Sequence, residues 1–113
     1  MFYQTSPVRG VNFRGEHIKN FVTNREMLKP EDLVELVREP DNAYDENAIM
    51  VMAQSIRDSA NFDLHIGYVA REIAETVAPL MDSGMPIRAS IFGFNTPITP
   101  VITIEQVDTE TTD

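Results

Sequence analysis

The sequence has no cysteine or tryptophan among its 113 residues, and it has only two histidines. The lack of cysteine excludes a disulfide scaffold, a cysteine-ligated zinc site and a cysteine nucleophile. His17 and His65 form neither a HExxH nor a His-x-His arrangement, and no G-x-S-x-G, Walker or G-x-G-x-x-G motif occurs. We therefore expect no metal ion, no cofactor and no enzymatic activity.

Long apolar runs are also missing, since no window approaches the roughly 20 residues that a membrane-spanning helix needs. The first residues lack the charged and apolar segments of a signal peptide. These features predict a soluble cytoplasmic protein that does not bind membranes. Hydrophobic residues make up 42% of the chain and charged residues 24%, which is typical of a folded protein. We predict a single domain over residues 1–107 and a frayed acidic tail over residues 108–113.

The net charge of −9 opposes general binding to polyanions, because nucleic acids bind non-specifically by exchanging counterions for Lys and Arg. The charge is unevenly distributed: residues 1–30 hold five basic and two acidic side chains, a net of +3, and the remainder carries −12. A local basic surface on such a protein can bind a short strand. Alternatively, the acidic stretch containing Glu31, Asp32 and Glu35 engages a protein partner with a basic surface.

Alternating and β-branched runs predict about six strands and a mainly β (α+β) fold. The segment 33–39 also permits a helix, because Pro30-Glu31-Asp32 resembles a helix start. The polar residues 54–63 are expected to form an exposed hairpin connection of variable length. The predicted strands cover residues 8–13, 33–39, 48–53, 64–69, 87–94 and 98–107, with 17–22 as strand or loop.

One long helix is predicted after the fifth strand, where Ile73, Val77 and Leu80 repeat at helical spacing. Gly84 suits its C-terminal cap. Pro79 lacks the N–H that would bond to the Glu75 carbonyl, so we expect a kink or a break into two pieces. Strands and helix in this order suggest a small six-stranded barrel with the helix packed against one opening.

The loop before the third predicted strand has the most informative chemistry. Tyr44 can offer a stacking face to a nucleic-acid base, whereas the Asp45 carboxylate can only accept hydrogen bonds and repels phosphate. This combination favours a chain end with a free hydroxyl over a continuous phosphate backbone. The structural alternative is that Tyr44 covers the barrel rim while Asp45 and Asn47 hold the turn.

Three segments of the chain resemble the HIRAN domain family, and together they span Val8 to Phe94. They are VRGVNFRG near the start, REPDNAYDENAIMV in the middle and IGYVAREIAETVAPLMDSG after it. The resemblance implies a small barrel related to the oligonucleotide-binding (OB) fold. It also implies capture of a single-stranded DNA end through its free 3′-hydroxyl, in DNA repair or processing.

The resemblance assigns roles by matching position. It places Tyr44 in stacking on a base, Asp45 in accepting from the 3′-hydroxyl and Arg71 in contacting phosphate. Phe13 matches an aromatic residue of the same pocket, and Phe92 lies near another in a looser alignment. The candidate DNA-binding residues are Asn12, Phe13, Arg14, Tyr44, Asp45, Asn47, Tyr68, Arg71 and Phe92.

Two positions depart from the DNA-binding member of the family, since Asn12 stands where that member has arginine and Tyr68 where it has histidine. Arg14 and Arg9 are possible replacements for the missing cation. The predicted function is therefore binding of a single-stranded DNA end by a monomer or weak homo-oligomer. The alternative is an acidic protein-interaction factor, such as an accessory or phage counter-defence protein, that does not bind DNA itself.

Overall fold

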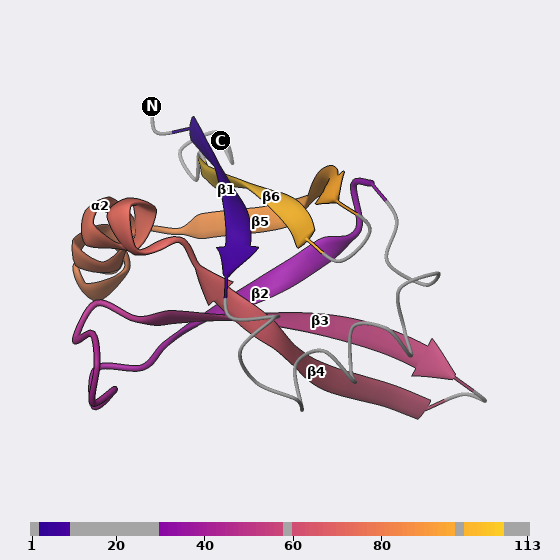
Figure 1. Cartoon of the computed structure of the whole chain (residues 1–113), viewed down its shortest axis with the longest axis horizontal. Helices are drawn as coiled ribbons and strands as arrows, with labels where there is room; N and C mark the ends of the chain where they lie inside the picture. Colours follow the sequence, from indigo (N-terminus) through magenta and orange to yellow (C-terminus); the bar gives the residue numbers. More distant parts are fainter. Residues whose placement is uncertain (1–2, 10–29, 58–59, 97–98, 108–113) are drawn as a thin grey trace, which may run out of the picture.

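The computed structural model describes residues 3–9, 30–57, 60–96 and 99–107, with backbone alone at 53–57, 60–64 and 96. Within these residues, six antiparallel strands close into a barrel in the order β1-β4-β3-β2-β5-β6, and one helix lies against it (Figure 1). The predicted mainly β, OB-like barrel is thus confirmed. The elements are β1 (Tyr3–Arg9), β2 (Leu33–Arg38), β3 (Ile49–Arg57), β4 (Ala60–Val69), α2 (Arg71–Asp82), β5 (Ile87–Thr96) and β6 (Thr99–Gln106).

The segment after residue 32 forms strand β2, so the helical alternative for residues 33–39 is wrong. Pairing with β3 from Val34 to Arg38 outweighs the helix-start signal before it. Helix α2 follows β4, which is the fourth strand within the described residues. The possible strand at 17–22 and the predicted strand residues 10–13 lie outside them.

The expected hairpin connection at 54–63 is shorter than predicted, because residues 54–57 extend β3 and residues 60–63 belong to β4. The ladder continues from the pair Gln54–Asp63 to the pair Arg57–Ala60. In Figure 1 the two strands run side by side to the far end of the molecule. The backbone hydrogen bonds of an antiparallel ladder do not depend on which side chains the strands carry. The part of the β3–β4 hairpin at residues 54–57 and 60–63, the β3–β4 arm, therefore needs no alternation of apolar and polar residues.

The core fills the barrel and the space beneath α2. Each barrel strand contributes inward residues, and α2 adds Ala74, Val77 and Ala78 from one face. No helix in the described parts of the chain combines the length and apolar character needed to span a bilayer. The buried core residues from the strands are Val8, Val34, Ile49, Val51, Ile66, Val69, Ala89, Ile91, Ile102 and Ile104.

Helix α2 runs unbroken through Pro79, so the expected break into two pieces is wrong. Glu75 and Pro79 are both exposed, and water can therefore satisfy the carbonyl that the proline leaves without a donor. The predicted cap at Gly84 is confirmed: its φ is 91°, and its N–H donates to the Met81 carbonyl at 3.0 Å. The Met85 N–H donates to the Leu80 carbonyl at 3.1 Å, which completes a Schellman motif.

The start of α2 is tied to β1 by one buried hydroxyl. The Ser6 side chain is fully buried, and its Oγ accepts a hydrogen bond from the Ala70 N–H at 3.0 Å. The same hydroxyl donates to the Pro7 carbonyl at 2.9 Å. Because Ala70 immediately precedes Arg71, this contact sets where the first turn of α2 leaves the barrel.

Replacing Ser6 with alanine should lower the free energy of unfolding by about 1–3 kcal/mol, because the buried Ala70 N–H loses its acceptor. Urea denaturation followed by circular dichroism measures this change. Thr5→Ala, at the exposed neighbouring position, is the control and should cost about 0.5 kcal/mol or less. Equal effects of the two substitutions would show that the Ser6 hydroxyl does not hold the helix start.

Candidate nucleic-acid interface

The loop between β2 and β3 is held in one conformation by its own side chains. The Asn42 Oδ1 accepts hydrogen bonds from the backbone N–H groups of Tyr44 at 2.8 Å and Asp45 at 3.0 Å. The Asp45 Oδ1 accepts from the Asn47 N–H at 2.9 Å, and its backbone carbonyl accepts from the Ala48 N–H at 3.0 Å. These are Asx-type turns, which short polar side chains favour. They fix the backbone that presents Tyr44 and Asp45.

Glu39 connects this loop to strand β4. Its Oε1 accepts hydrogen bonds from the Asn42 Nδ2 at 2.7 Å and from the Tyr68 hydroxyl at 2.9 Å. The Tyr68 ring in turn meets the His65 ring edge-on, with centroids 5.0 Å apart and an interplanar angle of 73°. A chain of contacts therefore runs from β4 through Glu39 and Asn42 to the backbone of the loop tip.

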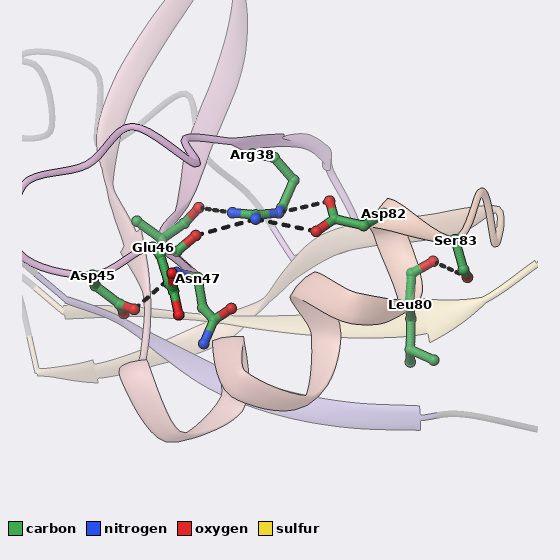
Figure 2. A network of polar contacts seen from close by, with 8 residues as sticks. Arg38, Asp45, Glu46, Asn47, Leu80, Asp82 and Ser83 are labelled. Atoms are coloured by element: carbon green, nitrogen blue, oxygen red, sulfur yellow. Dashed lines mark hydrogen bonds and ion pairs between the residues drawn. The ribbon is translucent and has the colours of Figure 1, made fainter.

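A second anchor, the Arg38 guanidinium, joins the end of β2 to the far side of the loop and to α2 (Figure 2). Its Nη1 donates to the Ala48 carbonyl at 2.9 Å and its Nη2 to the Glu46 carbonyl at 3.1 Å. Its Nε and Nη2 donate to the two carboxylate oxygens of Asp82 at 2.9 and 3.2 Å. The fork geometry of arginine serves all these acceptors at once.

The hydrogen bond from Arg38 is the main cause that lowers the pKa of Asp82 from its ordinary value of 3.8, with Coulombic attraction to the same residue adding to it and desolvation opposing it. Since the pKa is lowered on folding, the contact stabilises the protein above pH 3.8 and loses this effect as the pH falls through the lowered pKa.

Three groups of different chemistry meet at the loop tip. The Tyr44 side chain is 83% exposed, so its ring is available for stacking. The Asp45 side chain is only 20% exposed, and its Oδ2 lies 3.9 Å from the Nε of the exposed Arg71 at the start of α2. An acceptor from the loop and a cation from the helix therefore lie close together, and the exposed Tyr44 is adjacent to Asp45 in the chain.

A second cation stands next to Tyr68. Arg9 is exposed at the end of β1 and pairs with Tyr68 in the β1–β4 ladder. Side chains directly opposite each other in an antiparallel ladder share a face, with Cβ atoms about 5 Å apart. The structure thus places Arg9, one of the two replacements expected for the missing cation, beside Tyr68.

The structure does not bring Phe92 to this group. Phe92 lies on β5, and three strand-to-strand steps separate β5 from β4 in either direction around the closed barrel. Its side chain is 61% exposed, so it faces outward on the opposite side from Tyr68. The remaining candidates, Asn12, Phe13 and Arg14, lie outside the described residues.

Sequence reasoning missed Glu39, Asn42 and Arg38 as parts of the site. Asn42 carries a local signal, because an asparagine after proline and aspartate is a common turn former. Glu39 and Arg38 have no such signal, since their partners Tyr68 and Asp82 are distant in the sequence. Among the described residues, no group of three or more His, Asp or Glu side chains is placed to hold a metal ion.

Within the described residues, one helix packs on a closed six-stranded barrel, and the surface carries an exposed ring, an acceptor and two cations. This is the architecture of a small OB-like binding module. The model of the HIRAN domain family matches residues 2–100, so the chain belongs to this family. The predicted family is therefore confirmed. HIRAN domains are binding modules, and membership implies nucleic-acid binding.

Two solved structures share this fold. The crystal structure of the HIRAN domain of human HLTF has a TM-score of 0.63 and 24% identity, with 92% of this chain and 74% of that chain covered. A crystal structure of a protein from Lactobacillus plantarum has a TM-score of 0.65 and 24% identity, with 88% and 89% covered. A search of curated proteins found no match.

Substituting Asp82→Asn should reduce stability most at neutral pH, and the difference from the parent protein should shrink as the pH falls below 3.8 and through the lowered pKa of Asp82. Urea denaturation at pH 7 and at acidic pH measures it. Glu75→Gln, also exposed on α2, is the control and should leave the pH profile unchanged. If Asp82→Asn lowers the free energy of unfolding by the same amount at both pH values, the contact between Arg38 and Asp82 does not depend on charge.

The Glu39–Tyr68 contact should give a coupling energy of about 1 kcal/mol in a double-mutant cycle of Glu39→Gln and Tyr68→Phe, because each substitution alters the same hydrogen bond. Chemical denaturation of the four proteins measures the coupling. Amide hydrogen exchange should also quicken at Tyr44 and Asp45 in Glu39→Gln. If the two losses in free energy of unfolding are strictly additive and the amide exchange rates are unchanged, β4 does not support the loop.

Proposed function

We propose that this HIRAN domain binds the 3′-hydroxyl end of single-stranded DNA at the surface formed by Tyr44, Asp45, Arg71, Tyr68 and Arg9. The observation that carries the proposal is the half-buried Asp45 carboxylate, 3.9 Å from Arg71 and next to the 83% exposed Tyr44. A role in DNA repair or processing follows, since free 3′ ends arise there.

Charge decides which part of a strand fits this surface. A carboxylate accepts hydrogen bonds and repels phosphate, so the ligand must present a donor to Asp45. Every internal sugar–phosphate linkage of DNA has its 3′ oxygen esterified, whereas the terminal sugar offers a hydroxyl. Arg71 then contacts the phosphate next to the terminal sugar, and the terminal base stacks on the Tyr44 ring.

The two arginines explain how an acidic protein can hold DNA. Arg71 and Arg9 flank the site from α2 and β1, and each is exposed. With two cations at the site among the described residues, we expect binding to use a short stretch of strand and to draw little on the counterion release that drives binding to long polyanions. The acidic remainder of the chain repels further phosphates. This arrangement favours recognition of an end over coating of a strand.

Fluorescence anisotropy with two oligonucleotides of the same sequence, ending in a 3′-hydroxyl or a 3′-phosphate, tests the proposal. The hydroxyl end should bind about 10-fold tighter or more, because the phosphate both removes the donor and faces Asp45. Tyr44→Ala should weaken binding about 10-fold through lost stacking. Equal affinity for the two ends would refute the proposed 3′-end recognition.

The Asp45→Asn substitution separates the role of charge from that of shape. This variant keeps an acceptor oxygen but removes the repulsion, so the preference for the hydroxyl end should shrink while overall DNA affinity stays the same or rises. Asp41→Asn, in the same loop but with an exposed side chain, is the matched control and should retain the preference. If Asp45→Asn keeps the same preference for the 3′-hydroxyl end, Asp45 is not the group that recognises it.

A further inference from the structure

Within the described residues, the joint between β2 and β5 is short, with two registered pairs, as many as the joint between β1 and β4. Its ladder consists of the pairs Leu33–Ser90 and Val34–Ala89, and beyond them the strands diverge toward α2 (Figure 1). A groove of about 460 Å³ opens there, which we name the seam groove. It is lined by residues 33–36 of β2, Met81 of α2 and residues 87–89 of β5.

The seam groove combines apolar side chains with an open strand edge. Leu36, Met81 and Ile87 are partly buried and pack against the core, while Leu33 at the rim is 62% exposed. In the described part of the chain, the side of β2 that faces β5 has no ladder partner at Leu36. Such an edge can pair with an added strand, whose alternate side chains would enter the groove.

The rim of the groove has a definite charge. Glu31 and Glu35 are exposed and form no ion pair with any described residue. The one cation of the lining, Arg88, is paired with Glu105 at 2.9 Å, so its charge is already compensated. The Glu31 N–H also donates to the Ile91 carbonyl at 2.7 Å, which holds this acid against β5. The surface is therefore acidic around an apolar floor.

We propose that the seam groove binds an extended, basic segment of a partner protein by strand addition to β2. Apolar side chains of the segment enter between Leu36 and Ile87, and the lysine or arginine residues between them face Glu31 and Glu35. Four residues of β2 line the groove, which matches about four to six residues of an extended peptide. The exposed Phe92, diagonal to Leu33 across the ladder, extends the apolar rim.

This surface is separate from the proposed DNA site. The seam groove lies where β2 meets β5, whereas Arg9 and Tyr68 stand where β1 meets β4. The same chain can therefore hold a strand end on one side and a protein segment on the other. Failure of DNA binding would leave the seam groove untouched, and the reverse also holds.

Titration of the ¹⁵N-labelled full chain with an acetylated heptapeptide of alternating lysine and apolar residues, Lys-Leu-Lys-Val-Lys-Leu-Lys, tests the proposal by NMR. Amide shifts are expected at residues 35–37 and 87–88, with saturation below about 1 mM. Two control peptides should each bind at least about 10-fold more weakly than this heptapeptide. One has the same composition in the order Lys-Lys-Leu-Val-Leu-Lys-Lys, and the other replaces lysine by glutamate.

Exposed substitutions, which spare the core, complete the test. Glu35→Lys and Leu33→Ser should each weaken the peptide about 5-fold or more, while neither changes affinity for the DNA end. Tyr44→Ala is the matched control and should bind the peptide normally. Equal binding of the reordered peptide, shifts confined to other strands, or no binding at about 1 mM would each overturn the proposal.

Discussion

The arrangement of the candidate site depends on the Arg38 guanidinium. This one group joins the end of β2, the loop segment after Asp45 and the last residue of α2. Ser6 ties down the opposite end of the same helix through Ala70. With both ends of α2 attached to the barrel, Arg71 has little freedom to move away from the loop, and its approach to Asp45 is a consequence of these two ties.

The loop itself needs few apolar contacts because its polar groups satisfy one another. Asn42 bonds the backbone of the tip, Glu39 bonds Asn42, and Tyr68 bonds Glu39. No described buried side-chain nitrogen or oxygen lacks a partner. A fully satisfied polar network of this kind favours one geometry. It leaves the Tyr44 ring outside the network, free to meet a ligand.

The described residues place exposed charges of different sign at two surfaces. Arg9 and Arg71 stand with Tyr68 and Tyr44 on one side, while Glu31 and Glu35 border the β2–β5 seam. The net charge of −9 hides this division, since it sums over both surfaces. An acidic protein can therefore present one surface suited to a nucleic-acid end and another suited to a basic segment.

Local patterns in the chain were enough to predict the small β barrel, the long helix with its Gly84 cap, and the polar turn that carries Tyr44 and Asp45. Such features depend on neighbouring residues, through apolar spacing, turn chemistry and cap geometry. The same reasoning failed at the β3–β4 arm and at Pro79, where backbone pairing and packing outweighed local preference. By contrast, the folded barrel was needed to find that Arg9 lies beside Tyr68, that Glu39 bonds to the loop and that Phe92 lies on the opposite side. The physical reason is that barrel closure and strand register join residues far apart in the chain, and no local pattern records which of them will meet.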